Sequence, residues 1–452
     1  MKQLTLYYKE PRRIKNIRMR EEFTLERATR FGGFNLLSDW ISSTGLDRWL
    51  ERDFGHIKAP WALYPLSHTV RDLIDVYSIG LKRISHIPDV SGDAMLLEKR
   101  EREKMPDFTL YYKDLERFRG EEDIERLCHI RDRLNGKALK RVRRPVLDFD
   151  TSVETVYGAQ EGAKVSYNPH KKGRPSFQPM VCRERNTALF VHGRLRGGDP
   201  PDGREMSDFI EEVIIRLPKR RGRRVEGYRF LARADSQFDN ERSYAAFEDH
   251  QGGYVVRARM RRDLQGKLYS MPSRAWQRME TEAGEIQVTS FEIKRENWSR
   301  PRRIVAIRWR DETDRQGCFW DSYGYSYSAY TTNLQWHPRD IYRFYDAGAD
   351  VENGVKEAKR GFGIDRFSSE HFYANAADLQ LRLIAHNLMV RYGEKILGYS
   401  GPRLTAETIR RRLLEIPGVL IKRAGQWILK LPERFRFRDH WPVFRERLVS
   451  AS

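Results

Sequence analysis

From Pro145 to Ala258, the hydrophobic residues recur with alternating strand and helix periods, and the order of these segments limits what the chain can fold into. The spacing predicts three strands, a helix, a strand, a second helix and a last strand, the order βββαβαβ. This order is typical of an α/β (α+β) fold in which helices flank a sheet. The predicted strands are Val146 to Thr151, Phe177 to Glu184, Ala188 to Leu195, Tyr228 to Asp235 and Tyr254 to Ala258, and the predicted helices are Arg204 to Leu217 and Asn240 to His250.

The segments on either side of this region predict further parts of the molecule. Residues 1–140 contain several stretches with apolar residues three and four apart, which predicts an N-terminal helical module. Lys137 to Arg144 has no apolar stripe and precedes a proline, so it should be a solvated linker. Residues 259–330 hold short strand-like pieces without a strong helical period, which predicts a β-rich insertion. After it we expect a helix through Glu352, a long helix from Asn375 to Leu397, and a basic C-terminal region, 401–452, with a helix at Ala406 to Glu415 and a hairpin turning at Gly425.

The charge of the chain indicates a polyanionic partner. The 452 residues include 84 Lys and Arg against 64 Asp and Glu, a formal net charge of +20, which attracts nucleic acid at a distance. Hydrophobic residues at 39% and aromatic residues at 12% are too frequent for a disordered basic tail, so the chain should fold. No apolar run approaches the roughly 18 residues of a spanning helix, and three cysteines without a CxxC pair favour reduced thiols. We therefore expect a cytoplasmic protein with no membrane partner.

Acidic residues mark the ends of two predicted strands. Asp148 and Asp150 lie on the same side of the first strand because side chains alternate along a strand, and Asp235 ends a later one. If these strands are neighbours, Asp150 and Asp235 meet at one edge of the sheet, where carboxylate oxygens would hold a divalent cation such as Mg²⁺. A third carboxylate would complete such a site.

Glu352 is the candidate for the third carboxylate. On a helix, Glu352, Lys356 and Lys359 fall at i, +4 and +7 and form one polar stripe, which offers one metal ligand and two phosphate contacts. The alternative is an exposed Glu–Lys pair that stabilises the helix by only about 0.2–0.5 kcal/mol.

Several motifs in order resemble those of bacterial insertion-sequence transposases with an RNase H-like DDE catalytic domain, in the branch that carries a β-rich insertion before the glutamate. The motifs are LDFDTS, VYGAQEGAKVSYNPHKKGRPSFQP, LRGGD, ARADSQF, YTTNL and the segment from Tyr345 to Lys359, and together they span Val146 to Tyr392. The resemblance implies an RNase H-like mixed sheet flanked by helices. It also implies a catalytic domain in two parts, 141–258 and 331–400, interrupted by the insertion at 259–330.

The resemblance implies that Asp150, Asp235 and Glu352 are the catalytic triad and the metal ligands, with Mg²⁺ as the cofactor and Mn²⁺ as a substitute. Paired cations can activate an attacking water or 3′-hydroxyl and stabilise the leaving oxygen in an in-line displacement at phosphorus. Asp150 is preferred to Asp148 because the family's aspartate precedes a small hydroxyl residue, as Thr151 is here. Asp148 would then support the site from behind.

The family's signature around its glutamate is Tyr, two residues, Arg, three residues, Glu, six residues, Lys. In this chain the signature falls on Tyr345, Gly348, Glu352 and Lys359, so a glycine stands where the family has the arginine. That arginine acts as a phosphate clamp in the family. The candidates to replace it are Arg343, Lys356 and Arg360.

Other residues suit contacts with DNA. The stretch from Ser166 to Phe177 places Lys171, Lys172 and Arg174 among turn-forming residues, which suits a loop that grips phosphate, although a solvated loop is the alternative. The basic run from Pro218 to Gly227 follows a helix end, where cations are favourable, so it could either contact phosphate or only stabilise the helix. Related transposases stack an insertion-domain tryptophan on a flipped base, for which the candidates are Trp298, Trp309 and Trp320, with burial in the insertion core as the alternative.

These features predict a DNA transposase that binds the terminal inverted repeats of its element as a homodimer, cleaves double-stranded DNA with Mg²⁺ and transfers 3′ ends to target DNA. The N-terminal helices and the basic C-terminal region would bind the element ends, mostly through phosphate contacts. A bacterial, nucleoid-associated location follows from this interpretation. Two alternatives are a domesticated, catalytically silent DNA-binding protein, for which Gly348 is the motive, and an RNase H-like nuclease that cuts without joining.

Overall fold

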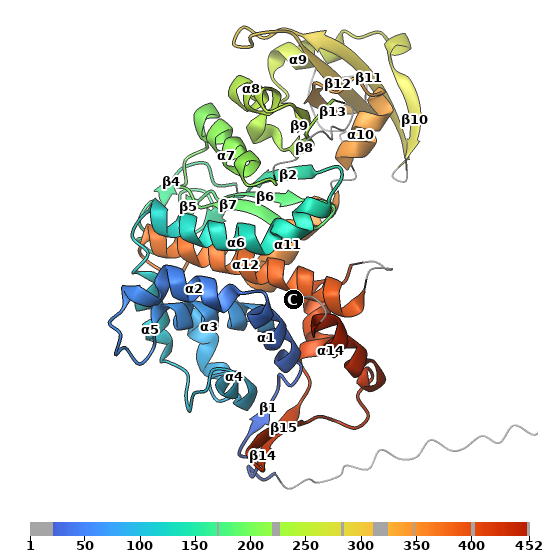
Figure 1. The fold of residues 1–452 in the computed structure, drawn as a ribbon. Coiled ribbons are helices and arrows are strands. Elements are labelled where there is room, and N and C mark those ends of the chain that lie inside the picture. The colour runs from blue at the N-terminus through green and yellow to red at the C-terminus, as the bar shows by residue number, and fades with distance from the viewer. Residues whose placement is uncertain are drawn as a thin grey trace, which may run out of the picture.

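The computed structural model describes residues 21–169, 171–218, 227–281, 284–310, 324–346, 349–398 and 403–449. In this part of the chain, a nine-stranded mixed sheet is flanked by helices on both faces (Figure 1). The strand order is β10-β11-β12-β13-β9-β8-β2-β6-β7. The predicted α/β class is confirmed.

Strand β2, Val146–Thr151, lies in the RNase H-like part of the sheet and pairs on both sides. It runs antiparallel to β6, Met180–Glu184, which is followed by β7, Phe190–Arg194. On its other side it runs parallel to β8, Phe230–Ala234, which pairs in parallel with β9, Gly252–Arg257. The order β7-β6-β2-β8-β9 is the one expected of an RNase H-like sheet. One prediction was wrong in detail, because the expected strand from 177 to 184 is divided between β5, Pro175–Phe177, and β6.

Two helices connect the parallel strands and cover one face of the sheet. Helix α7, Gly203–Ile215, begins with a capping box in which the Asp202 carboxylate accepts hydrogen bonds from the backbone of Arg204 and Glu205. Helix α8, Glu241–Asp249, follows β8 after a short 3-10 turn. Phe149 of β2 points to this face and packs edge-on against Phe209, Phe238 and Phe247. Because side chains alternate along a strand, Asp148 and Asp150 point to the opposite face.

The predicted β-rich insertion extends the same sheet. Strands β10, Gln277–Thr281, β11, Gly284–Ile293, β12, Arg302–Arg310, and β13, Tyr325–Thr332, form an antiparallel meander whose last strand pairs with β9. The Thr332 hydroxyl donates to the Tyr254 carbonyl at 2.7 Å and fixes this junction. Helix α9, Arg262–Tyr269, was not predicted, because it buries only Leu264 and Leu268 and so has a weak helical period.

The N-terminal region is helical, as predicted. Its last helix, α6, continues through Lys137 to Arg141, so the linker expected from Lys137 onward was largely wrong. The reason is Leu139 of this basic run, which is buried in the hydrophobic core that Phe149 shares with α7 and α8. The helices are α1, Phe34–Ser43, α2, Leu46–Phe54, α3, Leu66–Ile79, α4, Ala94–Glu98, α5, Phe108–Leu115, and α6, Glu121–Arg141.

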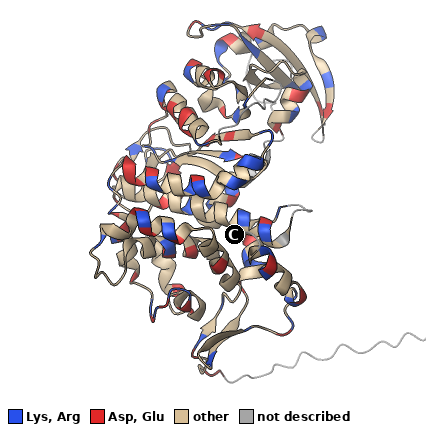
Figure 2. Cartoon of the chain, viewed as in Figure 1, with Lys and Arg blue, Asp and Glu red and all other residues tan. Residues whose placement is uncertain are grey.

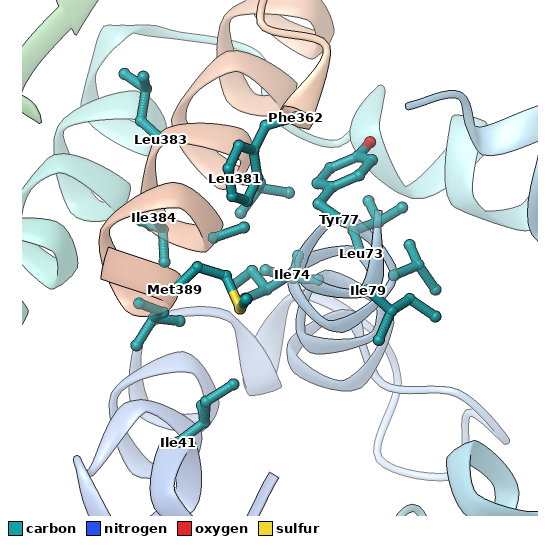
Figure 3. Close-up of a cluster of buried hydrophobic side chains, with 14 of the residues drawn as sticks. Ile41, Leu73, Ile74, Tyr77, Ile79, Phe362, Leu381, Leu383, Ile384 and Met389 are labelled. Atoms are coloured by element: carbon teal, nitrogen blue, oxygen red, sulfur yellow. The ribbon is translucent and has the colours of Figure 1, made fainter. Parts of the chain in front are cut away.

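Helix α12, Phe372–Leu397, joins the N-terminal helices to the sheet (Figure 1). Side chains from α1, α3, α11 and α12 meet in one hydrophobic cluster, in which Tyr77, Phe362 and Ile384 are buried (Figure 3). The helix is buried along most of its length, polar residues such as Asp378 and Arg382 included, because it packs against α3 and α6 and against the sheet through β7. The predicted helix through Glu352 is two helices, α10, Pro338–Asp346, and α11, Ala349–Phe362.

The C-terminal region packs back on the N-terminal helices. The Arg410 guanidinium donates to the backbone carbonyls of Tyr77, Ser78 and Gly361, which ties this region to α3 and α11. The predicted hairpin is confirmed and turns at Gly425, whose φ of +80° favours glycine. The elements are α13, Ala406–Ile409, a π-helix at Arg410–Leu414, β14, Gly418–Arg423, β15, Gln426–Lys430, and α14, Trp441–Val449, with β1, Ala28–Thr29, paired to β14.

Lys and Arg are spread over the helices and the sheet and do not gather in one segment (Figure 2). Within the described ranges, we find no helix with the length and apolar character needed to cross a membrane.

Replacing Ile384 by Ala tests whether the N-terminal helices share a core with α12. Ile384 is fully buried, so its truncation should lower the free energy of unfolding by about 2–5 kcal/mol. Urea unfolding followed by circular dichroism and by tryptophan fluorescence should show one shifted transition with both probes. Ile215→Ala is the matched control, since Ile215 is 70% exposed and its truncation should change stability by less than about 0.5 kcal/mol. A second transition that keeps the wild-type midpoint would contradict a shared core.

Candidate active site

Asp150 and Asp235 lie side by side at one edge of the sheet. Strands β2 and β8 are parallel neighbours in which Phe149 pairs with Ala234, and each aspartate is the next residue of its strand. The Thr151 hydroxyl donates to Asp235 Oδ2 at 3.0 Å and links the ends of the two strands. The convergence expected from the sequence, which depended on the strands being neighbours, is therefore present in the structure.

The surroundings of Asp235 favour a bound cation. Burial raises the pKa of Asp235, and hydrogen bonds from the Gln237 amide at 2.9 Å and from Thr151 oppose that rise. A carboxylate that has lost solvent in this way gains from a nearby positive charge, because the charge replaces the lost hydration.

Asp148 has a different environment, although it shares a face of β2 with Asp150. Its side chain is buried and accepts a hydrogen bond from Arg233 Nε at 2.6 Å. Arg233 also donates to the Phe344 carbonyl at the end of α10, at 2.9 Å. This pair connects β2, β8 and α10 under the candidate site, which agrees with a supporting part for Asp148.

Helix α11 brings Glu352 toward this face of the sheet. A Cβ atom on Gly354 would meet the Arg183 guanidinium at 2.2 Å, so the backbone of α11 lies directly on that side chain. Arg183 pairs with Asp148 in the β2–β6 register. Glu352 is in the first turn of α11, two residues before Gly354. Its side chain and Gly348 lie outside the described part of the structure.

The other residues of the Tyr345–Lys359 segment lie on α10 and α11. The Tyr345 ring packs against Tyr330 in a tilted arrangement with ring centroids 4.5 Å apart, and its hydroxyl donates to the Ala234 carbonyl at 3.4 Å, next to Asp235. Burial raises the pKa of Tyr345, so its hydroxyl stays protonated at neutral pH. Lys359 forms an ion pair with Glu154 at 2.7 Å, and Lys356 is exposed.

A cleft of about 1220 Å³ opens over the two aspartates. Its floor is the end of β2 and β8, and its walls come from the insertion strands and α10. Arg257 is exposed at the end of β9, one register position after the Ala234–Val256 pair and so beside Asp235. Besides Asp150 and Asp235, the lining includes three further arginines and five large aromatic side chains: Arg257, Arg278, Arg310, Trp309, Tyr325, Tyr330, Tyr342 and Tyr345.

Sequence reasoning missed most of these lining residues. Arg257 is the last residue of the strand GGYVVR, and a charged residue at the end of an otherwise buried strand was an available signal. Arg278 lies far from the acids in the sequence and reaches the cleft only because β10 belongs to the same sheet.

The tryptophan selected for DNA contact is in the core. Trp298 is 3% exposed and packs edge-on against Tyr244 at 5.6 Å, with Arg295 over its ring at 4.8 Å. The Trp298 ring therefore has no exposed face on which a base could stack, and the alternative interpretation, burial in the core, applies to it. Trp309 is the tryptophan that lines the cleft, and Trp320 lies outside the described residues.

The basic loop from Lys171 to Arg174 is on the surface. Lys171, Lys172 and Arg174 are all exposed, and two of them lie over the ring of Tyr157. Most of the basic run from Pro218 to Gly227 lies outside the described residues.

Among the described side chains, no group of three or more His, Cys, Asp or Glu residues is placed to hold a metal ion. Glu352 is not among those side chains. Asp150 and Asp235 do offer the hard oxygen ligands that Mg²⁺ and Mn²⁺ prefer.

The sequence matches the family described as "Transposase DDE domain group 1" over residues 12–450. The chain belongs to this DDE transposase family. No curated protein matches the sequence. Among solved structures, this transposase is similar to a "piggyBac transposase synaptic complex with hairpin DNA", with a TM-score of 0.38 and 12% identity, over 83% of this chain and 70% of that chain.

The two aspartates of β2 should differ in their effect on stability. Asp148→Ala leaves the buried Arg233 guanidinium without its carboxylate and should lower the free energy of unfolding by about 3 kcal/mol or more. Asp150→Asn, at a half-buried position, should lower it by less than about 1 kcal/mol. Urea unfolding of the two variants measures both values. Equal losses would contradict the division of the pair into a supporting residue and a site residue.

Proposed function

We propose that this DDE transposase binds the terminal inverted repeats of its insertion sequence, cleaves DNA with a divalent metal and transfers the 3′ ends to target DNA. The observation that carries the proposal is the pair of linked strand ends, Asp150 and Asp235, beneath a cleft whose walls carry three arginines, two acids and several aromatic side chains. Carboxylates at the base of such a cleft suit metal-assisted chemistry at a phosphate, and the arginines of the walls suit a polyanionic substrate.

Asp150, Asp235 and Glu352 are proposed as the catalytic residues and as the ligands of Mg²⁺, for which Mn²⁺ would substitute. DDE transposases usually use divalent metals, and a bound cation would supply charge neutralisation at the scissile phosphate. Thr151 holds the Asp235 carboxylate in place, and the Arg233–Asp148 pair fixes the two strands behind the site.

The cations around the acids are proposed to hold the DNA backbone. Lys356 and Lys359 of α11 are proposed to contact phosphates, as the polar stripe through Glu352 predicts, although Lys359 must exchange its ion pair with Glu154 for a phosphate. Tyr345 of α10, which belongs to the family's signature, is proposed as a further DNA contact. Gly348 leaves no side chain at the clamp position of the signature. Arg257 is a further candidate for that part, because it lies beside Asp235 in the register and lines the cleft.

The remaining parts of the proposal follow the family resemblance. A homodimer on double-stranded DNA would align two element ends, and the N-terminal helices of residues 1–140 and the region 401–452 would bind those ends. We propose the same division into a catalytic domain, 141–258 and 331–400, and an insertion, 259–330, as functional parts of one folded body. We also propose that the protein acts on the bacterial nucleoid.

Asp235→Asn tests the catalytic assignment. The variant should cut a duplex ending in one terminal repeat at least about 100-fold more slowly, because a metal ligand supplies several kcal/mol of charge stabilisation. A 3′-hydroxyl nick at the repeat boundary, and its joining to a second duplex, are measured on gels. Glu352→Gln should lose both steps as well, and removal of divalent metal by a chelator should abolish them in the wild type.

Asp208→Asn is the matched control. Because Asp208 is an exposed acid on α7, this variant should cut DNA at the wild-type rate. Tight repeat binding with no cutting by the wild type would contradict the enzyme and favour a silent DNA-binding protein. Cutting without joining would favour a nuclease.

Arg257→Ala tests the replacement for the signature arginine. If Arg257 contacts the scissile phosphate, its removal should slow cleavage by about 100-fold, the usual effect of losing one positioned donor. Repeat affinity, measured by gel shift, should change far less, because many other cations contribute to binding. Arg204→Ala, at an exposed arginine on α7, is the control. Cleavage at the wild-type rate by Arg257→Ala would remove Arg257 from the site.

A further inference from the structure

A small surface beside the candidate site combines exposed tyrosines with cations. We call it the tyrosine–lysine surface and define it by Tyr157, Tyr167, Lys171, Lys172 and Arg174. Tyr157 is 66% exposed and Tyr167 is 68% exposed, so both rings are largely open to solvent. Lys171 Nζ lies 5.1 Å and the Arg174 guanidinium 6.0 Å from the centre of the Tyr157 ring.

The surface is carried by a separate three-stranded sheet that is held firmly from below. Strand β5 lies between β3, Glu154–Thr155, and β4, Lys164–Val165. Phe177 of β5 is fully buried and packs edge-on against Phe367 and Phe372, with ring centroids 5.3 and 6.1 Å apart. The tyrosines are therefore exposed on a fixed base.

The basic loop is also fixed. The buried Asn168 side chain donates to Thr155 Oγ1 at 2.9 Å and accepts from the Lys171 amide at 3.0 Å. This arrangement holds Lys171 and Arg174 near Tyr157 without an acidic partner in the same loop. The neighbouring Lys164 is excluded from the surface because it forms an ion pair with Asp199.

The small sheet is rooted at the candidate site. It leaves the main sheet after Thr151 of β2 and returns at Met180 of β6, and these two residues are paired in the register. The ion pair between Glu154 and Lys359 connects it to α11. A DNA strand that leaves the acids along this connection would run toward the tyrosine–lysine surface.

The chemistry of the surface fits nucleotides that have lost their partners. An exposed aromatic ring stacks on the face of a base, and that face is covered by neighbouring base pairs in an intact duplex. Cations beside the ring fit the phosphates on either side of the stacked base. A purely electrostatic contact with duplex DNA would need the lysines and the arginine but would have no use for two exposed tyrosines.

We infer that the tyrosine–lysine surface binds unpaired nucleotides of the DNA next to the cut, with Tyr157 and Tyr167 stacking on bases and Lys171, Lys172 and Arg174 contacting phosphates. This inference rests on the proposed function for the kind of substrate. It adds a binding site for strand-separated DNA, outside the cleft and the triad.

Binding to two DNA molecules tests the inference. One is a duplex that ends in a terminal repeat, and the other is the same duplex with a short unpaired tail that carries 2-aminopurine. The wild type should bind the tailed DNA more tightly and quench the 2-aminopurine fluorescence by stacking. Tyr157→Ala and Tyr167→Ala should each weaken binding of the tailed DNA by about tenfold, the usual effect of losing one base–aromatic stack, and leave duplex affinity unchanged.

Tyr157→Phe keeps the ring and should keep both the affinity and the quenching, which separates stacking from a structural part for the hydroxyl. Tyr269→Ala, at a tyrosine on α9 that is 48% exposed, is the control for loss of an exposed ring. Lys171→Gln should weaken both DNA molecules and reduce the salt dependence of binding.

Equal loss on the two DNA molecules, or no loss on the tailed one, would overturn the inference. Loss of tail preference in Tyr157→Phe would also overturn it. Because no cutting is measured, an enzyme that fails to cleave leaves the result intact. Failure of the wild type to prefer repeat DNA over unrelated duplex, with tail binding retained, would instead count against the proposed function alone.

Discussion

The parallel pairing of β2 with β8 is the contact on which the candidate site depends. The two strands are separated in the sequence by the five strands β3 to β7 and by helix α7, yet their register sets Asp150 beside Asp235 at one edge. The Thr151 hydrogen bond and the buried Arg233–Asp148 pair maintain this register from both faces of the strands. Since a shift of one residue would turn every side chain of a strand to the other face, the acids meet only while this pairing holds.

The remaining helices keep that edge accessible. Helices α7 and α8 fill the face that carries Phe149, while α11 and α12 lie on the face of the aspartates and pack on the N-terminal helices. Helix α12, which is buried along most of its length, thus shields the aspartate face of the sheet from solvent. The cleft opens only where α10 and the insertion strands leave the strand ends uncovered.

Hydrophobic periodicity predicted the RNase H-like strands and the helices α7 and α8, because each has a clear apolar side, and it identified the acids at the strand ends. It failed where a helix buries only one or two apolar residues. Leu139 extends α6 through a basic run, and α9 buries only Leu264 and Leu268. Pattern alone also gave no means of distinguishing the buried Trp298 from Trp309 of the cleft, because both stand next to arginines in the sequence and only the packing of Tyr244 and Arg295 separates them. The lining residue Arg278 depends on long-range strand order, which a local period does not contain.

The pairing of β13 with β9 also determines how this chain can tolerate rearrangement. An insertion that formed its own sheet could be removed and its ends rejoined with little harm to the rest. Here its removal would strip the hydrogen-bonding partner from β9 and leave the unpaired N–H and C=O groups of a buried strand facing water. An unpaired edge of this kind can pair with other chains, so we expect a protein without the insertion to aggregate. Because β13 pairs with β9, the insertion is an integral part of the main sheet. Changes in its loops should be tolerated better than changes that break the hydrogen bonds between these strands.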